Sequence, residues 1–233
     1  MRRYLIVDDN PAFAENLAEI LADAGAHADV ATGGAAALER ARATRYDALI
    51  SDMRMPLMGG AELVHRVRRL DPGLPAVVVT AYTHDDDLHA ARREGLLAVL
   101  PKPAPVGRLL EIIASARRDG IVAVIEDDPS MSDNLCEVLR SAGFTAVTAA
   151  SLIETERLGG VRPFVALVDL RLPGGADGAA MTRFAERFPG VPMLVISGHD
   201  LTPPVPHLGY FHKPFHTADV LAAVERLYAE RHG

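Results

Sequence analysis

The sequence predicts an α/β protein with two tandem units, each built on a doubly wound, five-stranded parallel sheet with helices on both faces. Two observations support this prediction. Short, continuous apolar runs alternate with amphipathic stretches of helical period, which is typical of buried parallel strands joined by helices. The motifs of the first half also return in the same order in the second half. At 233 residues, the chain is long enough for two domains with a core each.

The strands of the first unit are predicted from short runs of apolar residues. Three runs are continuously apolar, as in strands that are buried on both faces, and two more are weaker. The strong runs cover residues 4–7, 48–51 and 77–80, and the weaker ones cover residues 28–31 and 98–100. Right-handed crossovers between such strands place helices on both sides of the sheet.

Helices are predicted between these strands. Over residues 12–24, apolar side chains recur at helical spacing and share one face, and Gly25 supplies a stop. Those apolar side chains are Phe13, Leu17, Ile20 and Leu21. The second unit repeats the pattern from a strand at residues 121–125 to a last helix near residues 217–232. We therefore expect one domain over residues 1–118 and a second over residues 119–233.

Four motifs of the repeat stand at or just after predicted strands. They carry an acidic pair, a lone aspartate, a hydroxyl and a lysine, in that order. In the first and second halves, respectively, these residues are Asp8 and Glu126 (the first of each acidic pair), Asp52 and Asp169, Thr80 and Ser197, and Lys102 and Lys213. The two members of each pair are separated by 118, 117, 117 and 111 residues, in the same order. Four matches in one order indicate a tandem duplication.

Acidic side chains end the predicted strands in both units. Because the carboxyl ends of parallel strands meet at one edge of a sheet, these side chains should converge on one crevice in each unit. Three carboxylates in one place raise each other's pKa unless a cation offsets their charge. Oxygen ligands in this number suit Mg²⁺. The predicted ligands are Asp8, Asp9 and Asp52 in the first unit and Glu126, Asp127 and Asp169 in the second.

A hydroxyl and an ammonium complete each predicted crevice. Thr80 and Ser197 end the fourth strand of their units, and Lys102 and Lys213 follow the last strand. A divalent cation, an ammonium and a hydroxyl around one carboxylate form a site that can accept a phosphoryl group. The carboxylate would attack phosphorus in line, and the positive groups would stabilise charge on the phosphoryl oxygens.

The use of lysine at these two positions supports the same site. Arginine fills 22 of the 24 basic positions, and the remaining two are Lys102 and Lys213. An ammonium is a compact point charge, whereas a guanidinium is a wide planar fork that a cramped carboxylate–phosphate site would not admit. A proline follows each lysine and makes a cis peptide bond there accessible, although the sequence alone does not determine the isomer.

Composition excludes several classes of function. The net charge is −7 and acidic residues outnumber basic ones in both halves, which argues against nucleic-acid binding. The single cysteine, Cys136, excludes an internal disulfide and favours a reducing compartment. The first residues run directly into Asp8 and Asp9, so they are neither a signal peptide nor a membrane span. We expect a cytoplasmic protein with no membrane or nucleic-acid partner.

With these residues assembled, each half of the chain resembles the receiver domain of bacterial two-component response regulators. The resemblance covers nearly the whole chain, and the combined motif is specific although each part alone is weak. It implies a flavodoxin-like or CheY-like sheet with strand order 2-1-3-4-5. In that family, an aspartate at the third strand accepts phosphate from a histidine kinase with Mg²⁺. The phosphorylated residues would then be Asp52 and Asp169.

The resemblance also assigns roles to the neighbouring residues. The acidic pair would hold the metal directly or through water, and the residue two beyond the acceptor would add its backbone carbonyl. The hydroxyl would contact the phosphoryl group, and the lysine would pair with it. In that order, the residues are Asp8 with Asp9, Arg54, Thr80 and Lys102 in the first unit, and Glu126 with Asp127, Arg171, Ser197 and Lys213 in the second.

The resemblance further implies a response regulator without an effector domain, unless these residues are a fragment of a longer chain. We expect catalysis only of its own phosphorylation and dephosphorylation, so the protein is not expected to be an enzyme. The implied partners are a histidine kinase or histidine phosphotransfer protein and a downstream protein reached through surface contacts. A homodimer is a further alternative.

The second unit departs from the family pattern between its hydroxyl and its lysine. Thr80 and Lys102 are 22 residues apart, whereas Ser197 and Lys213 are only 16 apart. Residues 198–207 include three prolines, which oppose a regular helix. We therefore expect the fourth helix of the second unit to be missing or shortened, and the loop in its place to expose apolar surface. That surface would be either covered by the first unit or offered to a partner.

Two further positions bear on signalling. The aromatic residue that the family often carries on the last strand is Val99 in the first unit and Tyr210 in the second. The first unit would therefore transmit phosphorylation by another route. We also hypothesise that Arg54 and Tyr82 obstruct in-line water and slow the loss of phosphate from Asp52.

Two rival functions stay open at this point. One is a non-phosphorylated scaffold whose acidic sites are relics, although every motif residue is retained in both halves. The other is a metal-dependent phosphohydrolase, because carboxylate nucleophiles and Mg²⁺ also serve that chemistry. The sequence offers no second acid–base candidate or substrate-capping insert for such an enzyme.

Overall fold

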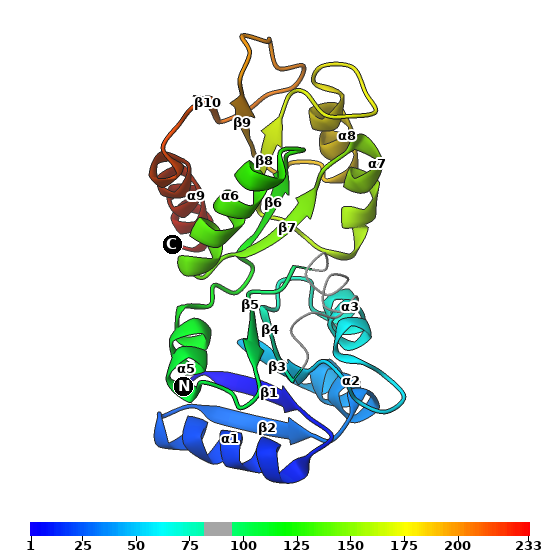
Figure 1. Cartoon of the computed structure of the whole chain (residues 1–233), viewed down its shortest axis with the longest axis vertical. Helices are drawn as coiled ribbons and strands as arrows, with labels where there is room; N and C mark the ends of the chain where they lie inside the picture. Colours follow the sequence, from blue (N-terminus) through cyan, green and yellow to red (C-terminus); the bar gives the residue numbers. More distant parts are fainter. Residues whose placement is uncertain (82–94) are drawn as a thin grey trace. The chain divides into compact units, whose positions relative to one another are not determined.

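The computed structural model describes residues 1–81 and 95–233. It divides into two compact units, Met1–Asp119 and Gly120–Gly233 (Figure 1). Each unit holds one five-stranded sheet in which all paired strands run parallel. The predicted fold class is therefore confirmed.

The sheet of the first unit has the strand order β2-β1-β3-β4-β5, as predicted. The strands lie within one or two residues of the predicted apolar runs. They are β1 (Arg3–Val7), β2 (His27–Ala31), β3 (Ala48–Asp52), β4 (Ala76–Thr80) and β5 (Ala98–Pro101). Over residues 1–81 and 95–119, four helices connect or follow them: α1 (Pro11–Asp23), α2 (Gly34–Ala43), α3 (Gly60–Leu70) and α5 (Val106–Ser115). The fourth helix expected between β4 and β5 lies outside the described residues.

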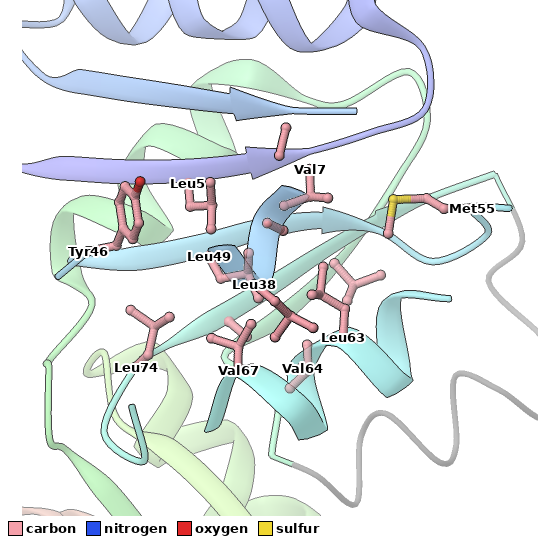
Figure 2. Close-up of a cluster of buried hydrophobic side chains, with 14 of the residues drawn as sticks. Leu5, Val7, Leu38, Tyr46, Leu49, Met55, Leu63, Val64, Val67 and Leu74 are labelled. Atoms are coloured by element: carbon pink, nitrogen blue, oxygen red, sulfur yellow. The ribbon is translucent and has the colours of Figure 1, made fainter. Parts of the chain in front are cut away.

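The pleat of each strand divides its side chains between two cores. Leu5 and Val7 of β1 lie on the face covered by α2 and α3, where Figure 2 shows them above the leucines and valines of those helices. Tyr4 and Ile6 lie on the opposite face, beneath α1 and α5. Because both faces are covered, the central strands are apolar at successive positions rather than at alternate ones.

The second unit has the corresponding order β7-β6-β8-β9-β10. Its strands are β6 (Ile121–Ile125), β7 (Thr145–Ala149), β8 (Val165–Asp169), β9 (Met193–Ser197) and β10 (Gly209–His212). Its helical segments are α6 (Pro129–Ser141), α7 (Leu152–Thr155), the 3₁₀ turn η1 (Glu156–Gly160), α8 (Ala179–Arg187) and α9 (Thr217–His232). The second helix of the unit is thus a single turn of α-helix followed by a 3₁₀ segment. That segment contains two consecutive glycines, which are poor helix formers.

Both units turn from their first strand into their first helix in the same way. In the first unit, the Asn10 side chain caps α1 by accepting a hydrogen bond from the Phe13 amide at 3.3 Å. In the second, Asp128 caps α6 through the amide of Ser130 at 2.8 Å. A proline follows each cap, where its missing amide costs no helical hydrogen bond. These caps fix the turn that carries the acidic pair.

The fourth helix of the second unit is missing, as the sequence predicts. Residues 198–208 form an irregular segment between β9 and β10. Leu201 and Val205 of this segment are partly buried against the core beside α8, whereas Leu208 at its end is 61% exposed, so the loop both covers apolar surface and exposes some. Pro204 lies over Gly178, where a Cβ would come within 2.7 Å of the proline Cδ. Pro204 therefore lies close to the residue that precedes α8.

Among the described residues, no helix is both long enough and apolar enough to cross a membrane.

A fold prediction concerns Gly60, the first residue of α3. A Cβ at this position would press against the carbonyl oxygen of Asp52 and lie 3.0 Å from the Met53 Cα, so the end of β3 would have to shift. We expect Gly60→Ala to destabilise the first unit by about 2–4 kcal/mol. Hydrogen exchange of the β3 amides during urea unfolding would measure this change.

Gly107→Ala in α5 is the matched control. A Cβ there meets no atom within 4 Å, and alanine favours the helix, so this variant should be neutral or stabilising by about 0.5–1 kcal/mol. Equal destabilisation by the two variants would contradict the close approach at Gly60.

Candidate functional site

Three carboxylates of the first unit meet at the carboxyl ends of its central strands. Asp8 and Asp9 directly follow β1, and Asp52 is the last residue of β3. One oxygen from each lies within 4.8 Å of the other two. Asp8 and Asp52 are 1% and 8% exposed, whereas Asp9 is open to solvent. The predicted acidic crevice is therefore present in the structure.

The ammonium of Lys102 lies against two of these carboxylates. Its Nζ donates a hydrogen bond to Asp8 Oδ2 at 2.6 Å and lies 3.3 Å from Asp52 Oδ2. The lysine follows β5, on the far side of β4 from Asp52. Its side chain crosses the strand ends to reach the acidic cluster. The Lys102–Pro103 bond is cis.

Backbone amides fix the two buried carboxylates. The Asn10 amide donates to Asp8 Oδ1 at 2.9 Å, and the Met53 amide donates to Asp52 Oδ1 at 2.8 Å. Each carboxylate therefore directs its other oxygen toward Lys102. Thr80 ends β4 and is fully buried, and its carbonyl accepts the Lys102 amide at 2.8 Å. The hydroxyl-bearing residue and the lysine are thus held at adjacent strand ends.

Burial dominates the electrostatics of the first site. It raises the pKa of Asp52, and the nearby charge of Asp8 adds to this rise, whereas Lys102 and the Met53 amide only partly oppose it. Burial alone would lower the pKa of Lys102, but the hydrogen bond to Asp8 and the charges of both aspartates outweigh it and raise that pKa. The site therefore holds a firmly protonated lysine beside a carboxylate that is costly to ionise.

The second unit brings together the corresponding residues. Glu126 and Asp127 follow β6, Asp169 ends β8, and one oxygen from each lies within 4.8 Å of the other two. The Lys213 Nζ donates to Glu126 Oε2 at 2.6 Å and to Asp169 Oδ2 at 2.7 Å. In this unit, the ammonium binds both buried carboxylates equally closely. The Lys213–Pro214 bond is also cis.

The same forces act in the second site. Burial raises the pKa of Glu126, and the attraction of Lys213 lowers it less than burial raises it. The pKa of Lys213 is raised because its bonds to Asp169 and Glu126 outweigh the desolvation of the ammonium.

The hydroxyl of the second site is part of a local network. Ser197 donates to the carbonyl of His199 at 3.2 Å, and the Tyr210 hydroxyl donates to the same carbonyl at 2.6 Å. An Arg171 guanidinium nitrogen lies 2.9 Å from His199 Nε2. The Arg171 amide also donates to Asp169 Oδ1 at 3.0 Å. The aromatic residue of the last strand is thereby joined to the hydroxyl-bearing residue through one carbonyl.

The donor set of each cluster fits a divalent cation. In each cluster, three carboxylates lie close enough together to share one metal ion. Their combined negative charge exceeds the single positive charge of the lysine ammonium beside them. Ionised carboxylates this close together are costly in a buried site, as the raised pKa values of Asp52 and Glu126 reflect. Each cluster could therefore hold a metal ion through oxygen ligands alone.

Some predicted contributions stay predictions. The described contacts do not place the backbone carbonyls of Arg54 and Arg171 toward a metal. Tyr82, the proposed shield against water, lies outside the described residues. Val99 of β5 is partly buried against the core beside α3, as a strand valine should be.

Sequence reasoning missed a contact between Phe13 and Lys102. The helical spacing of Phe13 places it on the apolar face of α1, and it does pack against that core. The structure also places the Lys102 Nζ 4.8 Å from the centroid of its ring. The available signal was its position, five residues after Asp8 in the first turn of the helix that follows the acidic pair.

Comparisons with known proteins relate this chain to a known family. The family model described as "Response regulator receiver domain" matches residues 4–114, which lie in the first unit. A response regulator receiver protein of Anaeromyxobacter sp. (strain Fw109-5) is 68% identical over 231 residues, covering 99% of this chain and 97% of that protein. The similarity to this relative therefore includes both units.

Other relatives match about half of the chain. An uncharacterised 14.6 kDa protein of Leptolyngbya boryana is 39% identical over 111 residues, covering 47% of this chain and 85% of that protein. A crystal structure of a CheY-like receiver domain protein from Methanospirillum hungatei JF-1 is 28% identical, covers 49% of this chain and 91% of that chain, and has a TM-score of 0.47.

The electrostatics of the first site predict how stability depends on pH. Because the pKa of Asp52 is higher in the folded state than its ordinary value of 3.8, ionising Asp52 costs stability. This cost begins to grow as pH rises above the unfolded pKa, and it is complete once pH exceeds the folded pKa. We expect Asp52→Asn to raise the melting temperature of the first unit at neutral pH. The gain should vanish well below the ordinary aspartate pKa. Thermal unfolding as a function of pH measures it.

Asp29→Asn is the control, for which we expect a change in melting temperature of the opposite sign. Burial acts to raise the pKa of Asp29, but hydrogen bonds from Arg3 at 2.9 Å and Tyr46 at 2.8 Å outweigh it and lower the pKa. Ionised Asp29 therefore stabilises the fold above its unfolded pKa, and this contribution is lost in acid. Asp29→Asn should lower the melting temperature at neutral pH. Destabilisation by both variants would refute the assignment at Asp52.

Proposed function

This chain belongs to the response regulator receiver family, and we propose that it accepts a phosphoryl group on Asp52 from a histidine kinase or a histidine phosphotransfer protein. The observation that carries the proposal is the Lys102 ammonium, 2.6 Å from Asp8 and 3.3 Å from Asp52 at the strand ends. A lysine held between two buried carboxylates is costly to desolvate, so its presence favours a role in the site over a purely structural one.

The residues of the first site have distinct roles in the proposed transfer. The amide of Met53 orients the Asp52 carboxylate, whose other oxygen attacks phosphorus. The new bond joins this oxygen to phosphorus, and the bond between phosphorus and the donor imidazole breaks. Lys102 binds a phosphoryl oxygen as charge develops on it, and the Thr80 hydroxyl stabilises a second oxygen.

The acidic cluster supplies the ligands for Mg²⁺. Asp8, Asp9 and Asp52 would hold the ion, with the carbonyl of Arg54 as a further ligand. A bound Mg²⁺ would neutralise charge on the transferring phosphoryl group and on the cluster itself. Asp9 suits a direct or water-mediated ligand because it is open to solvent beside two buried carboxylates.

The second unit has the parts of a second acceptor. Asp169, Ser197 and Lys213 correspond to the residues of the first site, and Glu126 and Asp127 would hold the ion. The Lys213 ammonium is 2.7 Å from the acceptor oxygen of Asp169, closer than Lys102 is to Asp52. We therefore assign Asp169 as a slower acceptor than Asp52.

The output of this two-component protein would be a protein–protein contact made in the cytoplasm. Phosphorylation would shift a pre-existing equilibrium between surface conformations, which a downstream partner reads. The chain would catalyse only its own phosphorylation and dephosphorylation. In the second unit, the carbonyl shared by Ser197 and Tyr210 is a direct link between the site and the last strand.

A chemical phosphodonor tests the proposal without a cognate kinase. Acetyl phosphate with Mg²⁺ should add a phosphoryl mass to the intact protein, and peptide mapping should place it on Asp52 first. Asp52→Asn should abolish the adduct on Asp52 and leave only the slower one on Asp169, and Asp9→Asn should slow formation of the Asp52 adduct about tenfold or more because a metal ligand is lost. Intact mass spectrometry over time measures both effects.

Three outcomes would argue against this function. A lack of adduct in the wild-type protein would favour a scaffold. An unchanged adduct in Asp52→Asn would move the acceptor elsewhere. Steady release of phosphate from simple phosphoesters would indicate a phosphohydrolase.

A further inference from the structure

We propose that Phe13 is a positioning residue of the first site, whose ring holds the Lys102 ammonium away from the acceptor carboxylate. The Lys102 Nζ lies 4.8 Å from the ring centroid, within the range of a cation–π interaction. An aromatic ring attracts the ammonium without adding a further negative charge to the acidic cluster, as a carboxylate in its place would. The kinetic part of the inference rests on the proposed function, whereas the geometric part does not.

The distances around Lys102 support an intermediate position for its ammonium. It is 2.6 Å from Asp8 Oδ2 but 3.3 Å from Asp52 Oδ2. The ammonium therefore makes one close hydrogen bond and lies near one aromatic ring. Its contact with the acceptor is looser than an ordinary charge-assisted hydrogen bond, which is about 2.7–2.9 Å long.

The second unit shows the same site without a ring. Met131 stands at the position that corresponds to Phe13, two residues after the proline that begins the helix. There, Lys213 is 2.6 Å from Glu126 and 2.7 Å from Asp169, so both carboxylates hold it closely. The two lysines therefore differ along with two neighbouring residues, Phe13 against Met131 and Asp8 against the longer Glu126, and only the first pair differs in an aromatic ring.

This difference has a consequence for reactivity. An acceptor oxygen bound tightly by an ammonium must give up part of that interaction before it can attack phosphorus. Because Phe13 and Asp8 both attract the Lys102 ammonium, its interaction with the Asp52 oxygen is weaker. Lys102 can then turn toward an incoming phosphoryl oxygen. Removal of the ring should let the ammonium settle on Asp52 and slow the transfer.

The position of Phe13 suits this role better than a purely structural one. It lies in the first turn of α1, directly beyond the acidic pair, and it is only half-buried. Leu17 and Leu21, further along the same face, are fully buried and fill the core beneath the helix. Phe13 can therefore contact the core with one edge and the ammonium with its face.

The geometric test uses the two lysines as probes. With isotope-labelled lysine, the ε-methylene groups of Lys102 and Lys213 give two NMR signals, which Lys213→Arg assigns. In the metal-free protein, ring current should shift the Lys102 signal upfield. Phe13→Met, which installs the residue of the second unit, should abolish this shift, and Phe13→Tyr should keep it. Met131→Phe should create a similar shift at Lys213.

The kinetic test measures adduct formation at Asp52 with acetyl phosphate and Mg²⁺. Phe13→Met should slow it about fivefold, the scale of one cation–π contact at a partly buried site. Phe13→Tyr should restore the wild-type rate, and Met131→Leu should not affect Asp52. If Phe13→Met fails to fold, judged by circular dichroism, Phe13→Leu replaces it.

The outcomes separate this inference from the proposed function. An unchanged Lys102 signal in Phe13→Met would overturn the contact, and a lost shift with an unchanged rate would overturn the positioning role. Equal slowing by Phe13→Tyr would show that Phe13 acts only through packing. If the wild-type protein forms no adduct, the proposed function and the kinetic role fail, while the NMR shifts still decide the contact.

Discussion

The balance of charge at the strand ends is the constraint on which the site depends. Each sheet directs three carboxylates to one point, and two of them are buried. A lysine from the last strand offsets part of this charge through hydrogen bonds of 2.6 Å to Asp8 and to Glu126. The remaining negative charge favours a cation, and a cation beside a nucleophilic carboxylate favours a phosphoryl group. The fold thus prepares a site that is incomplete without its ligands.

The two units show how one arrangement can be tuned in different ways. The first unit places an aromatic ring beside its lysine, whereas the second places Tyr210 and Ser197 on a shared carbonyl. The second unit also replaces a helix with a proline-rich loop, which Leu201 and Val205 anchor to the core. The surroundings of Asp52 and Asp169 therefore differ, although their carboxylate clusters match.

Much of this fold could be predicted from the sequence, because the repeated motifs fall at strand ends that parallel topology brings together. Asp52 and Lys102 are 50 residues apart in the chain, yet the rule for strand ends places them in one crevice. Contacts set by packing could not be predicted in this way. From the sequence, Phe13 is predicted to be a core residue, because its contact with Lys102 depends on the rotation of α1 about its axis. The loop that contains Leu201 is predicted to be exposed, because its prolines indicate only that it is not a helix. They do not indicate which of its side chains pack against the core.

The central claim is that strand-end carboxylates form a divalent metal site beside the acceptor. Anomalous diffraction from a crystal grown with Mn²⁺ in place of Mg²⁺ tests it most directly. The account predicts an anomalous peak bound by the carboxylates of Asp9 and Asp52, with Lys102 still beside the cluster. Manganese bound elsewhere in the crystal, with no peak at this cluster, would contradict it.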